Sequence, residues 1–275
     1  MYSRKKLIYL HLGIRGGFKT NMLKDLFGLE GKVSLVTGAG RGIGKAAALG
    51  LAEAGSQVAL VSRSRNELEE VARGIEKLGR KALVLPADLS RFETIPGLVD
   101  RAVEEFGRLD VLVNNAGTNR KRPTVEVPWE DFDAIIGLNL KAAFILSQAA
   151  IKQMLKQGGG KIINVTSMTA AIGIPTSAVY CSSKGGLQQL TKSLAVELAK
   201  SNIQVNAIAP GMIETELAKP ILARPEFLNW VMPKIPMGRL GQPDDLKGAF
   251  IFLASSASNY ITGHTLFVDG GWLAG

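Results

Sequence analysis

The sequence predicts an α/β fold in which one doubly wound parallel sheet lies between two layers of helices. Short apolar runs rich in β-branched residues alternate with longer helical patterns along the chain. The runs are apolar at nearly every position, as in strands that helices cover on both faces. Because strand–helix–strand connections are right-handed, the repeated unit winds into three layers, with ligands bound at the carboxyl ends of the strands.

Seven apolar runs are the expected strands, and the periodic segments between them are the expected helices. The strands are predicted at residues 33–36, 57–61, 82–85, 111–113, 161–165, 203–208 and 265–268. Helical periodicity lies at residues 42–54, 65–78, 92–106, 130–156, 179–200 and 243–255. No internal linker, charge block or short repeat interrupts the alternation, which predicts a single domain over residues 22–275.

Charge and composition exclude several classes of protein. The net charge is +9, but residues 1–21 hold five basic and no acidic side chains, which leaves 28 basic against 24 acidic side chains in the remainder. A balance this even predicts no surface that follows the phosphates of a nucleic acid. One cysteine and two histidines exclude a disulfide framework and a cysteine- or histidine-rich metal centre, so no metal is expected.

The basic segment 1–21 is interpreted as a disordered tail or as an over-long gene start, with Met22 as the true beginning. An organelle-targeting or membrane-surface segment is the alternative. Its apolar run at residues 7–10 is too short to span a membrane, and no small-residue cleavage site follows it. No other stretch reaches 18 apolar residues. We therefore expect a cytoplasmic protein that does not enter a membrane.

The first candidate site is the sequence TGAGRGIG at residues 37–44, between the first strand and the first helix. Its glycines permit close approach of a ligand, and the N-terminus of the following helix presents free N–H groups to a pyrophosphate. The spacing differs from the GxGxxG of the usual dinucleotide fingerprint. Taken alone, the motif is also compatible with a glycine-rich turn that binds nothing.

Further motifs follow in the order typical of the short-chain dehydrogenase/reductase family. After TGAGRGIG the chain has NNAG at residues 114–117, Asn139, Ser167, YCSSK at residues 180–184 and PG at residues 210–211. From about Leu29 to Leu273 the chain resembles this family. The resemblance implies a Rossmann-type fold with a seven-stranded sheet in one domain, which agrees with the strands counted above, and a nicotinamide-dependent oxidoreductase.

Tyr180 and Lys184 are expected to carry the acid–base chemistry. Four residues apart on a helix, their side chains lie on one face, where a nearby ammonium favours the tyrosinate over the phenol. Tyr180 can then remove a proton from an alcohol or return one to a carbonyl, and Ser167 would hydrogen-bond the substrate oxygen. The resemblance implies that Lys184 also binds the nicotinamide ribose and that Asn139 holds a proton-relaying water. The predicted catalytic residues are Asn139, Ser167, Tyr180 and Lys184.

The end of the second strand indicates which cofactor is bound. An acidic residue there favours NAD(H), whereas an arginine accommodates a 2′-phosphate. The chain has Ser62 followed by Arg63, and Arg41 can approach the same phosphate, so NADP(H) is expected over NAD(H). With the positions matched by resemblance, the predicted cofactor-binding residues are Gly38, Gly40, Arg41, Gly42, Ile43, Gly44, Ser62, Arg63, Asp88, Leu89, Asn115, Ala116, Gly117, Tyr180, Lys184, Pro210, Gly211, Ile213 and Thr215.

Substrate recognition is predicted at the carboxyl end of the fourth strand. The sequence GTNRKRP at residues 117–123 brings three cations, Arg120, Lys121 and Arg122, to the cleft, where they would suit a carboxylate. Residues 212–238 are expected to form a mobile lid. The predicted substrate-binding residues are Ser167, Tyr180 and Arg120. Cys181 has no histidine close in sequence to act as its base, so we expect it to pack rather than react.

Three segments together resemble the gluconate 5-dehydrogenase branch of the family. They are GTNRKRP, KIPMGRLGQPDDLKG at residues 234–248 and VDGGWLAG at residues 268–275. This resemblance implies reversible hydride transfer between NADP(H) and a sugar acid, with D-gluconate and 5-dehydro-D-gluconate as the expected pair; close relatives handle 2-deoxygluconate or 2-dehydro-3-deoxygluconate. A 3-oxoacyl-[acyl-carrier-protein] reductase and a non-catalytic NADP-binding regulator remain alternatives. The resemblance also implies a homotetramer.

Overall fold

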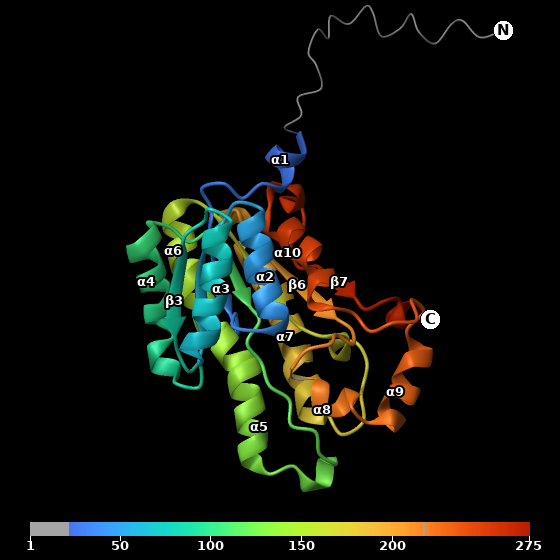
Figure 1. The fold of residues 1–275 in the computed structure, drawn as a ribbon. Coiled ribbons are helices and arrows are strands. Elements are labelled where there is room, and N and C mark those ends of the chain that lie inside the picture. The colour runs from blue at the N-terminus through green and yellow to red at the C-terminus, as the bar shows by residue number, and fades with distance from the viewer. Residues whose placement is uncertain (1–21, 217) are drawn as a thin grey trace, which may run out of the picture.

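A parallel sheet with strand order β3-β2-β1-β4-β5-β6-β7 forms the centre of the protein (Figure 1). The structure is a computed structural model that describes residues 22–216 and 218–275. The strands are β1 Val33–Thr37, β2 Gln57–Ser62, β3 Ala82–Pro86, β4 Val111–Asn114, β5 Gly160–Val165, β6 Ile203–Pro210 and β7 Thr265–Val268. Each of the seven predicted strands is confirmed, and the sheet order reverses direction between β1 and β4, where this class of fold binds its ligands.

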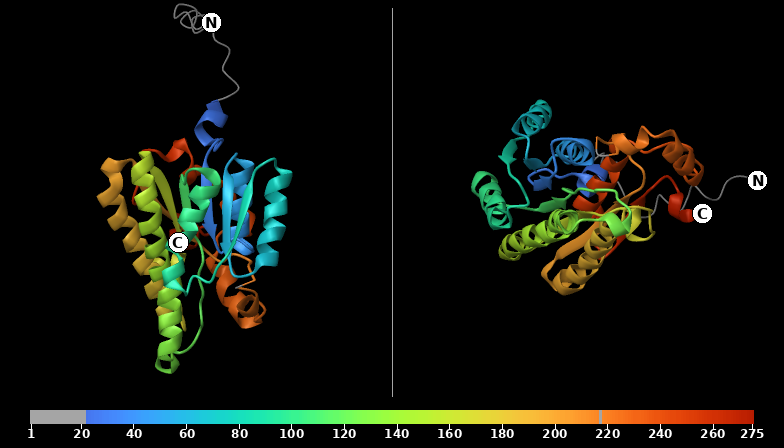
Figure 2. Two further views of the ribbon diagram at one scale, coloured as in Figure 1. Left: turned by 90° about the vertical axis from the view of Figure 1, so that its left-hand side faces the viewer. Right: turned by 90° about the horizontal axis from the view of Figure 1, so that it is seen from below.

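Helices cover both faces of the sheet in the three-layer arrangement that the sequence predicts (Figure 2). Alternate strand residues divide the core: Val36 packs among side chains from α2, α3 and α10, whereas Leu35 packs among side chains from α4, α6 and α7. The helices are α1 Met22–Phe27, α2 Gly42–Glu53, α3 Arg65–Lys77, α4 Pro96–Phe106, α5 Trp129–Ile136, α6 Ala142–Gln157, α7 Ala178–Leu198, α8 Lys219–Leu222, α9 Pro225–Val231 and α10 Lys247–Ala254.

Two of the predicted helices begin later than the sequence pattern suggests. The pattern at 92–106 starts as a 3₁₀ turn, Phe92–Thr94, and the α-helix begins at Pro96, a residue that suits the first helical turn because it lacks an N–H. The pattern at 243–255 likewise opens with a 3₁₀ turn, Pro243–Leu246, before α10. In both cases proline fixes a local backbone angle that apolar periodicity does not register.

The predicted helix 130–156 is divided by a π-helical turn, Gly137–Lys141, between α5 and α6. A π turn inserts an extra residue into the helical hydrogen-bond pattern and often marks a functional site. Taken as one run, Trp129–Gln157 is long and apolar enough to cross a membrane by length and composition alone. In the fold, however, Leu146, Ala150 and Met154 of this run pack into the core that α4 and α7 share.

The carboxyl ends of the strands are flanked by α5 on one side and by α8 and α9 on the other (Figure 1). The expected lid, residues 212–238, contains α8, α9 and a 3₁₀ turn, Met232–Lys234. Val231 and Ile235 bury this segment against Met168 and Trp272 in a small apolar cluster. Movement of the segment stays a prediction. The expectations about the basic segment 1–21 lie outside the described residues.

Candidate active site

The glycine-rich loop between β1 and α2 is shaped by backbone angles and contacts that side chains would prevent. Gly38 and Gly42 have φ of +63° and +53°. A Cβ on Gly44 would overlap the carbonyl oxygen of Gly38 and lie 2.5 Å from Nδ2 of Asn115. Arg41, the residue before α2, makes no side-chain cap, so the first N–H groups of the helix are free for an anion. The loop therefore fits a pyrophosphate.

Asn115 and Thr37 tie the glycine-rich loop to the end of β4. The amide Nδ2 of Asn115 donates to the carbonyl oxygens of Thr37, at 2.8 Å, and of Gly38, at 3.3 Å. The Thr37 hydroxyl accepts from the backbone N–H groups of Asn115 and Ala116, at 2.9 and 3.0 Å. Thr37 was not among the predicted site residues, yet its buried hydroxyl joins the two segments. Its position as the first residue of TGAGRGIG could have indicated this role.

The predicted catalytic residues converge at the carboxyl ends of β4 and β5. Ser167 follows β5, and its hydroxyl hydrogen-bonds Tyr180, which lies in the first turn of α7. Lys184, one turn further along α7, places Nζ 5.8 Å from the centre of the Tyr180 ring. The same Nζ donates to the carbonyl oxygen of Val165 at 2.7 Å. Lys184 is thus held beside Tyr180 by the end of the neighbouring strand.

Asn139 joins this group from the π turn between α5 and α6. Its Oδ1 accepts from the N–H of Thr118 at 2.8 Å, and its Nδ2 donates to the carbonyl oxygen of Thr118 and to the Ser183 hydroxyl. A Cβ on Gly117 would lie 3.1 Å from Oδ1 of Asn139 and 3.5 Å from Nζ of Lys184. The structure therefore brings all four predicted catalytic residues together, with the segment after β4 as their common neighbour.

Burial controls the protonation of the two central groups. It raises the pKa of Tyr180 to about 12, partly offset by the hydrogen bond from Ser167, and it lowers the pKa of Lys184 to about 8. The expectation that the ammonium would favour the tyrosinate is therefore corrected for this state: removing both groups from water penalises both charges, so the neutral phenol is preferred. Lys184, in contrast, can gain and lose a proton close to neutral pH.

The residues expected at the adenosine ribose surround the end of β2. The hydroxyl oxygen of Ser62 is buried and has no hydrogen-bond partner among the described residues, which leaves a polar atom available to a ligand. Arg63 is exposed, and Arg41 reaches back to pair with Glu67, with Nη1 3.7 Å from Oε1. Glu67 was missed by the sequence reasoning, which considered only the strand end.

Other predicted cofactor residues complete the floor of the site. After β3, Asp88 accepts hydrogen bonds from the backbone and hydroxyl of Ser90, which lower its pKa, and Leu89 is buried. After β6, Gly211 packs so closely on Asp269 that a Cβ would lie 2.6 Å from its Cα. Thr215 approaches the glycine-rich loop, since its Cγ2 would lie 3.3 Å from a Cβ on Gly42. The segments after β3 and β6 thus flank the loop.

The three cations after β4 have different partners. Arg120 and Arg122 both bind the buried carboxylate of Asp131 on α5, and they lower its pKa. Lys121 instead places Nζ 4.5 Å above the ring of Phe227 in α9. Burial lowers the pKa of Lys121, and the charge of Arg224 lowers it further. The predicted substrate residue Arg120 thus pairs with Asp131 while its side chain stays half exposed, and its role in substrate binding stays a prediction; Lys121 faces the segment expected to form the lid.

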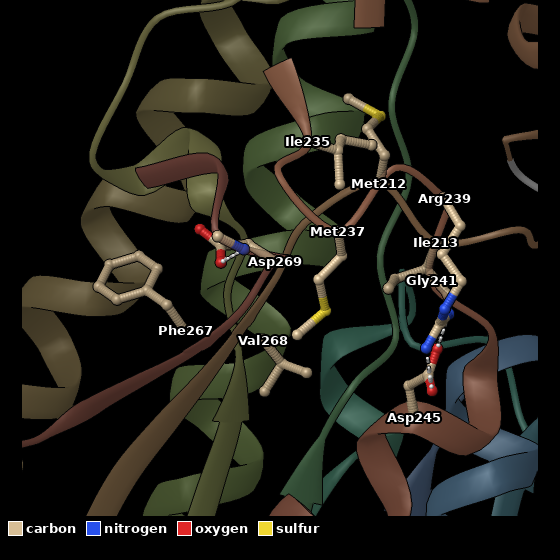
Figure 3. A pocket seen from close by; sticks show the side chains of 12 residues that line it. Met212, Ile213, Ile235, Met237, Arg239, Gly241, Asp245, Phe267, Val268 and Asp269 are labelled. Carbon is tan, nitrogen blue, oxygen red and sulfur yellow. Dashed lines mark hydrogen bonds and ion pairs between the residues drawn. The ribbon is translucent and has the colours of Figure 1, made fainter. Parts of the chain in front are cut away.

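Cys181 and a separate cavity lie beside this site. Cys181 packs against the apolar cluster that includes Met168 and Trp272, in agreement with a packing role. A cavity of about 360 Å³ lies between β7 and residues 235–241, where Arg239 pairs with Asp245 (Figure 3). None of the four catalytic residues lines it. Within residues 22–216 and 218–275, no group of three or more His, Cys, Asp or Glu side chains could hold a metal.

Comparison with known proteins gives matches over most of the chain. A family profile described as enoyl-(acyl carrier protein) reductase matches residues 38–273. A 2-dehydro-3-deoxy-D-gluconate 5-dehydrogenase of Escherichia coli (strain K12) is 46% identical over 254 residues, which cover 92% of this chain and 100% of the relative. A 3-oxoacyl-[acyl-carrier-protein] reductase of Thermotoga maritima (strain ATCC 43589 / DSM 3109 / JCM 10099 / NBRC 100826 / MSB8) is 41% identical over 245 residues, covering 88% and 98%.

Solved structures agree with these matches. The crystal structure of a gluconate 5-dehydrogenase from Burkholderia cenocepacia J2315, in complex with NADP and tartrate, has a TM-score of 0.88 and 38% identity, covering 92% of this chain and 99% of that one. Sequence, sheet order and the convergence of Ser167, Tyr180 and Lys184 thus lead to the same assignment. The chain belongs to the short-chain dehydrogenase/reductase family and is an oxidoreductase that acts on CH–OH groups.

Proposed function

We propose that the protein transfers a hydride reversibly between NADP(H) and a sugar acid, with D-gluconate and 5-dehydro-D-gluconate as the preferred pair. The observation that carries the proposal is the convergence of Ser167, Tyr180 and Lys184 beside the glycine-rich loop. Lys121, whose Nζ lies over the ring of Phe227, adds a cation near this site. Two relatives described above act, by their names, on gluconate or 2-dehydro-3-deoxy-D-gluconate.

The residues of the site divide the acid–base work among them. When bound, the nicotinamide cofactor supplies or accepts the hydride. Tyr180 is a neutral phenol in this structure, the form that donates a proton to a carbonyl oxygen in the reductive direction. Ser167, already bonded to Tyr180, would hold the same substrate oxygen. Lys184, whose pKa is lowered to about 8, can return a proton to Tyr180 near neutral pH.

The preference for NADP(H) rests on the charges around the end of β2. No acidic side chain stands at position 62, whose buried hydroxyl has no partner, while Arg63 is exposed and Arg41 lies at the start of α2. Arginine binds a phosphate through several N–H groups at once, so these two residues would bind a 2′-phosphate. The related gluconate 5-dehydrogenase structure carries NADP.

We place the substrate carboxylate at Lys121 and Arg224. Arg120 and Arg122 share the single carboxylate of Asp131, which balances one of their two charges. Lys121 lies near Arg224, whose charge lowers its pKa, and near Cys181, the residue beside Tyr180. Two cations close to the catalytic tyrosine repel each other, and a bound carboxylate would relieve that repulsion.

A panel of substrates tests the proposal. Initial rates would be measured with D-gluconate, 2-deoxy-D-gluconate and acetoacetyl thioester, with NADP(H) and with NAD(H). We expect NADP(H)-linked turnover of a sugar acid, and Lys121→Gln should raise its KM about tenfold while Lys77→Gln, an exposed lysine on α3, leaves it unchanged. Absence of turnover with every sugar acid would contradict the proposal.

The second candidate is a 3-oxoacyl-[acyl-carrier-protein] reductase, which the Thermotoga maritima relative favours. Its acyl chain is attached to an acidic carrier, and a basic surface near the cleft would also suit that partner. Reduction of the acetoacetyl thioester without sugar-acid turnover would favour this function. Tight NADPH binding without turnover of any substrate would favour the non-catalytic regulator.

We also propose that the protein is a homotetramer. Large apolar side chains are exposed on α6, at Phe144 and Leu155, and on α7, at Val196, where another subunit could cover them. β7 is an open edge of the sheet and exposes Phe267. Light scattering should give about four times the chain mass of 29.3 kDa, and a mass near 29.3 kDa would contradict the proposal.

A further inference from the structure

The strongest unassigned feature is a carboxylate, Glu67, beside the glycine-rich loop. Glu67 lies in the first turn of α3, and its Oε1 is 3.7 Å from Nη1 of Arg41. A Cβ placed on Gly40 would lie 2.8 Å from Oε2 of Glu67 and 3.2 Å from the Ser62 hydroxyl. Glu67 and Ser62 therefore approach the loop from the same side, where Arg41 and Arg63 are expected to meet the adenosine ribose.

Glu67 differs in its surroundings from Glu69 and Glu70, the two carboxylates that follow it on α3. Glu69 pairs with Arg65 on its own helix, and Glu70 pairs with Lys45 on α2 at 2.7 Å. The side chain of Glu70 is 63% exposed, whereas that of Glu67 is 39% exposed. Only Glu67 of these three is near enough to Gly40 to meet a Cβ built there. Its charge therefore lies beside the loop at which the cofactor would bind.

We propose that Glu67 sets the choice between NADP(H) and NAD(H). The carboxylate holds Arg41 and carries a charge of the same sign as a 2′-phosphate, so it opposes NADP(H) in two ways. It also returns an acidic acceptor to the end of β2, where Ser62 stands in place of an acid, and such an acceptor suits the ribose hydroxyls of NAD(H). The inference rests on the proposed use of a nicotinamide dinucleotide at the glycine-rich loop.

Electrostatic opposition of this kind makes cofactor preference moderate rather than absolute. Arg41 and Arg63 attract the 2′-phosphate, while Glu67 both occupies Arg41 and repels the phosphate. Removal of the Glu67 charge should therefore strengthen NADP(H) binding and leave NAD(H) binding equal or weaker. A residue that only supported the fold would change the affinities for both cofactors in the same direction.

The test is direct binding of NADPH and NADH to the full-length protein, without substrate, measured by fluorescence titration of Glu67→Gln. Glutamine keeps the shape of the side chain and, like glutamate, suits the third position of a helix that Ser64 caps. We expect the ratio of the two dissociation constants to shift about tenfold toward NADPH, and the shift to shrink at high salt. Glu67→Ala, as a second variant, should shift the ratio in the same direction.

The matched control is Glu70→Gln, which removes an ion-paired carboxylate from the same helix without touching Gly40. We expect its ratio to stay within about twofold of that of the unchanged protein. An unchanged ratio in both Glu67 variants, or weaker NADPH binding, would overturn the inference. If the unchanged protein prefers NADH, the proposed NADP(H) preference fails. The change in the ratio of dissociation constants in the Glu67 variants then still decides the inference about Glu67. Binding of neither cofactor would overturn both.

Discussion

Substitution of Gly44 tests the glycine-rich loop most sharply, because the fourth glycine of TGAGRGIG has no room for a methyl group. The added Cβ would overlap the carbonyl oxygen of Gly38 and lie 2.7 Å from its carbonyl carbon and 2.5 Å from Nδ2 of Asn115. The backbone must move to relieve these contacts, because all three are closer than the 3.0 Å that real Cβ atoms keep from their neighbours. Overpacking of this kind costs about 1–3 kcal/mol, and here it displaces the N–H groups that face the pyrophosphate.

Gly97 provides the matched control, since it also lies in the first turn of a helix, α4, but nothing stands within 4 Å of a Cβ built there. Gly44→Ala should lower the melting temperature by about 2–4 °C per kcal/mol and weaken NADPH binding about tenfold or more. Gly97→Ala should instead stabilise the protein by about 0.5–1 kcal/mol and leave binding unchanged. NADPH affinity in Gly44→Ala within about twofold of the unchanged protein would refute the reasoning.

Two further predictions concern buried polar groups. Burial lowers the pKa of Lys161 from its ordinary value of 10.5 to about 8. Between these two pH values the unfolded chain binds more protons than the folded protein. The free energy of unfolding therefore rises with pH through this window. Lys161→Met should raise the free energy of unfolding at pH 7 by up to about 3 kcal/mol and remove the increase between pH 8 and 10.5. Urea unfolding at pH 7 and at pH 10 would measure both effects. A variant that is less stable than the unchanged protein at pH 7 would contradict the prediction. Asn139→Ala leaves the N–H of Thr118 without its partner and should lower stability by about 1–3 kcal/mol with loss of turnover, whereas full activity would exclude its role in the site.

The strands and the pair Tyr180 and Lys184 could be predicted because each depends on residues that are close together in the sequence. Continuous apolar runs are required of any strand buried on both faces, and the spacing of Tyr180 and Lys184 is one helical turn. The sheet also explains why Ser167 meets Tyr180 and Lys184. Ser167 follows β5, a central strand whose carboxyl end faces the start of α7.

The π turn, the partner of Arg120 and the position of Glu67 depend on contacts between segments that are distant in the sequence. Apolar periodicity gives no information about such contacts. The π turn at Gly137–Lys141 lies within a helical pattern that continues on both sides of it, and it is this turn that carries Asn139. Arg120 was expected at the substrate because it is a cation near the cleft, but its partner Asp131 comes from the next helix. Glu67 was overlooked for the same reason, because its approach to Gly40 depends on how α2 and α3 pack.

The pKa of Tyr180 shows where residue types alone mislead. A lysine one turn away predicts a stabilised tyrosinate, but that inference leaves out the burial of both side chains. Burial penalises both ions, so it raises the pKa of Tyr180 to about 12 and lowers that of Lys184 to about 8. The balance of burial and attraction between charges can be judged only once the depth of both side chains is known.

The measurement that tests the central claim most directly is the initial rate of Tyr180→Phe beside the unchanged protein, with D-gluconate and NADP or NAD. The substitution keeps the ring on α7 and removes only the hydroxyl that bonds Ser167. We predict NADP-dependent turnover in the unchanged protein and a loss of about 10³-fold in the variant. Turnover in Tyr180→Phe within about tenfold of the unchanged protein would contradict the assignment of Tyr180 as the acid and base of the reaction.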